Sequence, residues 1–163
     1  MGTEYQVRVA THWRSPAHKN LPEAVEKRLA ELNLRFSTYL PESELSRFNQ
    51  YDGGDWFEVS RETAEVVAYA LKIAADTDGA FDPTVGPAVN LWGFGPHVPR
   101  FDAPTEEQIE VVRQRIGFHQ LTVRQQPPAL QKSTPDVYVD LSAIAKGYAA
   151  DAIGALLKQV GYD

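Results

Sequence analysis

The sequence predicts an α+β fold in which a mainly antiparallel sheet packs with helices. Short alternating segments predict strands, and amphipathic segments with helix-capping residues predict helices. The two kinds of element do not alternate as regular strand–helix–strand units, which argues against a parallel sheet. The expected order is strand, helix, strand, helix, long loop, helix, three strands and helix. With 163 residues, the chain is expected to form a single domain over residues 1–163.

Local patterns predict the first elements. The alternation from Tyr5 to Trp13 is typical of a half-buried strand. Asn20 then precedes Leu-Pro-Glu, a helix start with an Asx cap and a proline in the first turn, and the helix is expected to reach Phe36. The loop from Ser37 to Asp55 is expected to hold one helical turn around Ser43–Phe48.

Capping residues mark two further helices. Ser60 is expected to cap a helix that ends near Asp78-Gly79. Thr105-Glu-Glu-Gln108 is a capping-box pattern, and the helix it opens is expected to run to about Ile116 and to end at Gly117. The remaining strand candidates are Trp56–Val59, Leu121–Arg124, Ala129–Lys132 and Val137–Asp140.

Composition excludes several classes of function. The 43% hydrophobic and 23% charged fractions are those of a globular protein. A formal charge of −6 without a basic run argues against a nucleic-acid partner. The absence of cysteine excludes disulfides, thiolate metal sites and thiol catalysis within this chain. No apolar run approaches the length of a membrane span.

The segment Thr77–Gly95 is the most unusual part of the chain. It holds four Gly, two Pro, two Asp and three aromatic residues in nineteen positions, and we expect no helix or strand there. It is too rich in aromatic residues for a solvated linker, so it is interpreted as a functional loop; the alternative is a loop that only covers the core. Asp78 and Asp82 could supply ligand oxygens or could simply be turn residues.

The segment Val139–Tyr148 combines a strand end, an acid and the start of a last helix that is expected to reach about Val160. The free N–H groups of a helix start favour phosphate, and Lys146 could add charge one turn later. The alternative is an amphipathic helix capped by Ser142. The glycine patterns of Walker and Rossmann nucleotide sites are missing. The histidines have no metal-ligand spacing and are expected to be structural or surface residues: His12, His18, His97 and His119.

Four segments in order along the chain, taken together, carry a family resemblance. They are Met1-Gly-Thr, Ser37–Asn49, Thr77–Gly95 and Val139–Asp151. They resemble the ApbE-type family of bacterial flavin transferases, the FAD:protein FMN transferases. The resemblance implies an ApbE-like α+β fold, binding of FAD and Mg²⁺, and attachment of FMN to a Thr or Ser of an acceptor protein. It covers only the N-terminal half of the family pattern.

The resemblance also implies roles for individual residues. The expected metal ligand is the carbonyl of Ala143, and Lys146 stands where some relatives carry Glu, so its role is not fixed. No catalytic residue is identified, because the metal-binding acids and the general base are expected in the missing C-terminal half. The residues expected to contact FAD are Met1, Tyr39, Ala80, Phe81, Asp82, Asp140 and Lys146.

Partners and location follow from the same resemblance. The acceptor is expected to be a subunit of a membrane redox complex or an exported relative, and a companion chain could carry the C-terminal half. The full-length bacterial protein is expected to be periplasmic or a membrane-anchored lipoprotein. Two other activities stay open: an FAD pyrophosphatase that gives FMN and AMP, and a non-catalytic FAD-binding module. A structural domain without a ligand is the third alternative.

Overall fold

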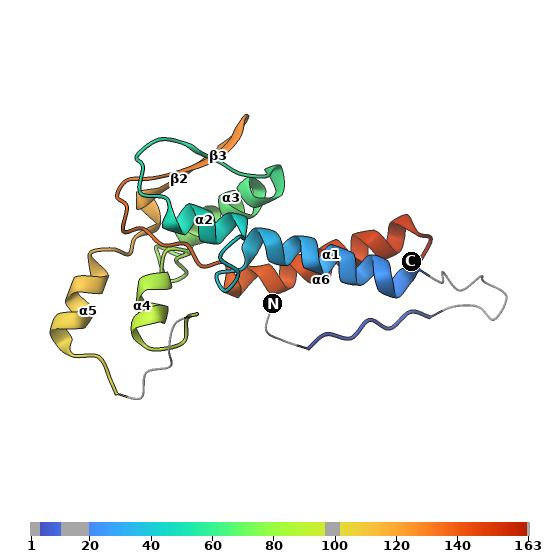
Figure 1. The fold of residues 1–163 in the computed structure, drawn as a ribbon, viewed down its shortest axis with the longest axis horizontal. Helices are drawn as coiled ribbons and strands as arrows, with labels where there is room; N and C mark the ends of the chain where they lie inside the picture. The colour runs from blue at the N-terminus through green and yellow to red at the C-terminus, as the bar shows by residue number, and fades with distance from the viewer. Residues whose placement is uncertain (1–3, 11–19, 97–101, 163) are drawn as a thin grey trace.

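The computed structural model describes residues 4–10, 20–96 and 102–162, and its helices and small antiparallel sheet confirm the α+β prediction (Figure 1). The helices are α1 Leu21–Phe36, α2 Glu44–Gln50, α3 Arg61–Asp76, α4 Gly86–Leu91, α5 Glu106–Arg113 and α6 Ser142–Gln159, with a 3₁₀ turn, η1, at Phe118–Gln120. The strands are β1 Phe57–Glu58, β2 Leu121–Gln125 and β3 Pro128–Lys132.

The sheet has the order β1-β3-β2, with both pairs antiparallel. Leu130 of the central strand lies opposite Phe57 on one side and Val123 on the other. Helix α3 packs against β2 and β3. Because Leu121 and Leu130 are buried, this small sheet forms one wall of the core.

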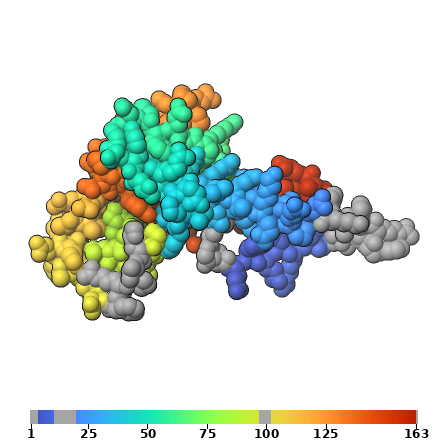
Figure 2. Space-filling model, viewed as in Figure 1, coloured from blue at the N-terminus to red at the C-terminus, as the bar shows by residue number. Residues whose placement is uncertain are grey.

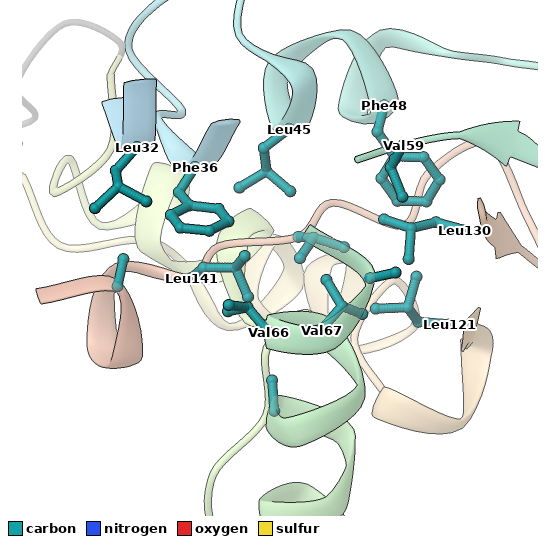
Figure 3. Close-up of a cluster of buried hydrophobic side chains, with 14 of the residues drawn as sticks. Leu32, Phe36, Leu45, Phe48, Val59, Val66, Val67, Leu121, Leu130 and Leu141 are labelled. Atoms are coloured by element: carbon teal, nitrogen blue, oxygen red, sulfur yellow. The ribbon is translucent and has the colours of Figure 1, made fainter. Parts of the chain in front are cut away.

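Apolar side chains from helices and sheet meet in one core (Figure 3). Helices α1, α2 and α3 each contribute two of the side chains that the figure labels, and the segment before α6 contributes Leu141. The labelled residues are Leu32, Phe36, Leu45, Phe48, Val59, Val66, Val67, Leu121, Leu130 and Leu141. Their burial fixes the positions of the loops that leave α1 and α3.

Helices α1 and α6 lie side by side and are joined by a polar cluster at Glu62 of α3 (Figure 1). The Glu62 carboxylate pairs with Arg28 and Arg35 of α1. It also accepts a hydrogen bond of 2.6 Å from the Tyr148 hydroxyl of α6. The rings of Phe36 and Tyr148 pack edge to face with centroids 5.6 Å apart. This cluster locks the three helices together beside the core.

The two strongest capping predictions are confirmed. The Ser60 hydroxyl accepts from the Thr63 N–H at the start of α3, and the Glu44 carboxylate accepts from both the Ser60 N–H and its hydroxyl. Thr105 and Gln108 form the capping box of α5, although the helix ends at Arg113 rather than at Ile116. Gly117 therefore lies beyond the helix, with a φ of 151°.

Two strand predictions were wrong. Residues 4–10 form no strand, and residues 11–13 lie outside the described residues. A strand needs a neighbouring strand to which it can hydrogen-bond. Residues 4–10 instead run alongside α1, where the Tyr5 hydroxyl donates to Glu26 (Figure 1). Val137–Asp140 pairs with no strand among the described residues. The Val139 N–H donates to the Asn49 side chain and the Asp140 N–H to the Pro83 carbonyl, so partners outside a sheet satisfy this backbone.

Two predictions about helices were also wrong. The Asn20 side chain, expected to cap α1, makes no capping bond. More importantly, α4 lies inside Thr77–Gly95, where no helix was expected. Pro87 is tolerated because it stands in the first turn, where the N–H that it lacks has no helical partner.

Candidate functional site

The described residues line an open cavity of about 970 Å³ between two loops and the start of α6. Its walls come from Ser37–Leu40 after α1, from the segment after α3 and from the first turns of α6. Figure 2 shows the cyan loop after α1 against the yellow-green α4 segment, and the Tyr39 hydroxyl donates to the Phe94 carbonyl across this contact at 3.3 Å. Segments distant in sequence thus form one site.

The cavity brings together every described residue for which the family resemblance implied a role. Tyr39, Ala80, Phe81, Asp82, Asp140, Ala143 and Lys146 all line it. Met1 lies outside the described residues, so its contact with FAD stays a prediction. The direct ligand contacts of the others also stay predictions, but their shared location is a property of the fold.

The loop after α3 turns sharply to present Ala80 and Phe81 to the cavity. Asp78 and Gly79 have φ values of 50° and 78°, a left-handed conformation that ends the helix. The Gly79 N–H donates to the Ala74 carbonyl at 2.8 Å, and the Phe81 N–H donates to the Thr77 hydroxyl at 3.2 Å. The predicted end of α3 is therefore confirmed, and the turn sets the position of the next residues.

Asp82 holds this loop through both carboxylate oxygens. Its Oδ1 accepts from the Thr84 N–H at 2.7 Å and from the Thr84 hydroxyl at 2.6 Å, and its Oδ2 accepts from the Phe118 N–H at 2.9 Å. The hydroxyl of Thr84, which is fully buried, accepts from the Gly117 N–H at 2.8 Å. Asp82 is thus a turn residue and a cavity residue at once.

Asp140 organises the opposite wall. Its N–H donates to the Pro83 carbonyl at 2.8 Å, and its Oδ1 accepts from the Ser142 N–H at 2.7 Å. The alternative in which Ser142 caps α6 is wrong, because Ser142 is the first residue of the helix and no side chain makes a capping bond from the N-cap position, Leu141. The Lys146 ammonium donates to the Ser142 carbonyl at 3.0 Å, which places its charge at the first turn of α6 beside Ala143.

Tyr138 packs against Gly86 at the start of α4 and stands two residues before Asp140 of the cavity wall. A Cβ on Gly86 would lie 2.2 Å from Cδ1 of the Tyr138 ring, so this close approach requires glycine. Burial raises the pKa of the Tyr138 hydroxyl and the negative charge of Asp140 raises it further, against smaller opposing effects of hydrogen bonds from Asn90, Thr38 and Asn49. The tyrosine is therefore neutral and joins three segments.

Sequence reasoning gave no role to Asn49, although it lies in the family-like segment Ser37–Asn49. Its side-chain Nδ2 donates to the Val139 carbonyl at 2.9 Å, and its Oδ1 accepts from the Val139 N–H at 2.8 Å. Nothing local in the sequence predicts this pairing, because ninety positions separate the partners. The signal available in the sequence was the place of polar Asn49 beside the apolar positions Leu45 and Phe48 of α2.

The cavity suits a large ligand with both aromatic and anionic parts. Its volume lies at the upper end of the range for small-molecule sites. Phe81, Val89 and Phe94 give it an apolar wall, and the start of α6 gives it the positive end of a helix dipole beside Lys146. Among residues 4–10, 20–96 and 102–162, no helix has the length and apolar character to cross a membrane.

A metal ion fits this site only together with a phosphate ligand. No cluster of three or more His, Cys, Asp or Glu side chains is present in the described part of the chain. Among the residues that line the cavity, Ala143 offers a carbonyl and Asp140 a carboxylate as hard oxygen donors, whereas both oxygens of the Asp82 carboxylate already accept hydrogen bonds. Mg²⁺ commonly binds through one or two such protein oxygens, with substrate phosphates and waters as its other ligands.

Comparison with known proteins gives one consistent family. The profile described as the ApbE family matches residues 1–163. A Vibrio cholerae protein named FAD:protein FMN transferase is 40% identical over 163 residues, which are 100% of this chain and 48% of the relative. An Escherichia coli K12 protein of the same name is 41% identical over 166 residues, covering 94% of this chain and 46% of the relative.

Solved structures agree with the sequence matches. The flavin transferase ApbE from Vibrio cholerae has a TM-score of 0.89 at 40% identity, covering 94% of this chain and 49% of that one. The apo flavinyl transferase ApbE from Pseudomonas stutzeri has a TM-score of 0.86 at 34% identity, covering 95% and 51%. The chain thus spans about half the length of the relatives it matches.

Proposed function

Because the chain belongs to the ApbE family, we propose that it takes part in the transfer of FMN from FAD to a Thr or Ser hydroxyl of an acceptor flavoprotein, with release of AMP. The observation that carries this proposal is the single cavity in which Tyr39, Phe81, Asp140 and Lys146 meet. The names of the relatives, FAD:protein FMN transferase, support the choice of ligand and reaction.

FAD would occupy the cavity with its rings against aromatic side chains and its diphosphate near the start of α6. Tyr39 and Phe81 offer ring faces for stacking. The positive end of the α6 helix dipole and the Lys146 ammonium offer positive charge to the diphosphate. Asp82 would act mainly by fixing the loop, since both its oxygens already accept hydrogen bonds.

We include Mg²⁺ in the proposal, held by the Ala143 carbonyl and by Asp140 together with the diphosphate of FAD. Both residues line the cavity at the start of α6. When bound, the ion would withdraw charge from the phosphate oxygens. The protein residues would keep the diphosphate in place beside it.

The proposed reaction is a displacement at phosphorus. The hydroxyl oxygen of the acceptor bonds to the phosphorus nearest FMN, and the bond from that phosphorus to the bridging oxygen breaks, so AMP leaves with the bridging oxygen. The hydroxyl proton needs a base, which we expect in the half of the relatives that this chain does not cover. This chain would therefore contribute binding and positioning.

One observation favours a second candidate function. The chain covers only about half of its relatives, and a half site could bind FAD without reacting. The chain alone would then be a non-catalytic FAD-binding module, and a companion chain would complete the enzyme.

We further propose that the acceptor belongs to a membrane redox complex or is an exported relative, and that the full-length protein is periplasmic or a membrane-anchored lipoprotein.

An acceptor-labelling experiment tests the proposal. The chain is incubated with FAD, Mg²⁺ and a Thr-containing acceptor domain, with and without the remaining segment of the Vibrio cholerae relative as a separate chain. Covalent flavin fluorescence on the acceptor after denaturing electrophoresis is the expected result with both segments present. FMN and AMP without labelled acceptor would indicate a pyrophosphatase, and FAD bound but unchanged would indicate a binding module. No binding of FAD under any condition would contradict the proposal.

A further inference from the structure

Asn49 lies outside the cavity but holds the chain that forms one of its walls. It stands on α2, next to the buried Phe48, and its amide pairs with both the N–H and the carbonyl of Val139. Val139 is fully buried, and no strand among the described residues pairs with it. Because a buried peptide group needs hydrogen-bond partners, the Asn49 side chain does here what a neighbouring strand would do in a sheet.

A buried lysine reinforces the same junction. The Lys132 ammonium donates to the Asn49 carbonyl at 3.0 Å and to the Val137 carbonyl at 3.5 Å. The end of α2 is therefore tied to Val137 and to Val139, through its main chain and its side chain respectively. Both the link to Val137 through Lys132 and the link to Val139 through the side chain therefore depend on the position of Asn49.

The junction continues directly into the cavity walls. Asp140 follows Val139, and its N–H donates to the Pro83 carbonyl at 2.8 Å. Pro83 follows Asp82 on the opposite wall, while the Asp140 carboxylate accepts from Ser142 at the start of α6. One run of hydrogen bonds thus leads from Asn49 to both walls that flank the expected diphosphate position.

We propose that Asn49 is a positioning residue for the flavin site: by clamping the Val139 peptide it fixes the turn that places Asp140 and Ala143 in the cavity. Its effect on FAD binding rests on the proposed function, but its effect on the turn does not. Substitution by alanine leaves both polar groups of the Val139 peptide without these partners. The turn from Asp140 to Ala143 then loses its fixed position.

The test compares Asn49→Ala and Asn49→Asp with Gln131→Ala. Asn49→Asp keeps size and the acceptor for the Val139 N–H but removes the donor to its carbonyl. Gln131 is the matched control, because its Nε2 also donates to a main-chain carbonyl, that of Gly54, at 2.7 Å, and it does not line the 970 Å³ cavity. Measurements are the FAD dissociation constant from flavin fluorescence, amide hydrogen exchange at residues 139, 140 and 142, and urea unfolding.

We expect Asn49→Ala to weaken FAD binding about tenfold and to speed amide exchange at residues 139 and 140 by more than its change in global stability explains. Asn49→Asp should keep the Val139 amide protected while still weakening FAD binding. Gln131→Ala should change the dissociation constant less than twofold.

Two results would overturn the inference. One is an unchanged FAD dissociation constant and unchanged exchange in Asn49→Ala. The other is an equal loss of affinity in Gln131→Ala at equal stability. If the unsubstituted chain does not bind FAD, the proposed function fails for this chain, and the exchange rates alone then decide the role of Asn49.

Discussion

The Thr84 hydroxyl is the centre of the loop that forms one cavity wall, and replacing it by valine tests that loop directly. The hydroxyl donates to Asp82 Oδ1 at 2.6 Å and accepts from the Gly117 N–H at 2.8 Å, in a fully buried position. Thr84→Val keeps the shape of the side chain and removes both bonds. Thr84→Ser keeps both bonds and removes one methyl group.

The expected magnitude follows from these contacts. A buried N–H that loses its acceptor costs about 1 to 3 kcal/mol, and losing a donor to the Asp82 carboxylate costs about 1.5 to 3 kcal/mol. The added methyl of valine offsets about 1 kcal/mol. We therefore expect Thr84→Val to lower the free energy of unfolding by about 3 kcal/mol, and Thr84→Ser by about 1 kcal/mol.

Urea unfolding followed by circular dichroism measures both variants. For a chain of this size, the expected loss in Thr84→Val corresponds to a fall in Tm of about 6 to 12 °C. The reasoning is refuted if Thr84→Val is no less stable than Thr84→Ser. It is also refuted if both remain within about 0.5 kcal/mol of the unsubstituted chain, the range typical of surface substitutions.

Three further predictions address the same region. Gly86→Ala should lower stability by about 1 to 3 kcal/mol in urea unfolding, because its Cβ would meet the Tyr138 ring at 2.2 Å; a stable variant would show that the ring moves freely. Since burial raises the pKa of Tyr138, its contribution to stability is complete below pH 10 and is lost as the pH rises through the higher folded-state pKa. The unsubstituted chain should therefore lose more stability than Tyr138→Phe between pH 9 and pH 11, and equal losses would contradict this. Asp82→Ala should weaken FAD binding more than Asp102→Ala in a fluorescence titration; equal affinities would count against the pocket assignment.

Local chemistry allowed much of the helical fold to be predicted. Ser60 and Thr105 cap their helices through bonds to residues three positions later, so the pattern that forms the cap is contained in a few residues. The end of α3 at Asp78-Gly79 was equally predictable, since few other residues adopt positive φ. The residues that line the cavity were predicted instead from the family resemblance. They belong to segments far apart in the sequence, which the fold brings together.

The wrong predictions of the two strands and of the segment that contains α4 depended on distant partners. The alternation that begins at Tyr5 predicts a strand only if another strand lies beside it. Helix α4 depends on the packing of Tyr138 against Gly86, more than fifty positions away, which no local pattern contains. The backbone of Val139 is satisfied by Asn49 rather than by a sheet, so an apolar run alone could not distinguish the two arrangements.

The most direct test of the proposed flavin site is an equilibrium titration of the chain with FAD, using one matched pair of substitutions. Ala143 and Ala150 are both exposed on α6, nearly two turns apart, and of the two only Ala143 lines the cavity. We predict one FAD bound per chain, with binding abolished in Ala143→Trp and unchanged in Ala150→Trp. FAD binding that survives Ala143→Trp, or its absence from the unsubstituted chain, would contradict a flavin site in this cavity.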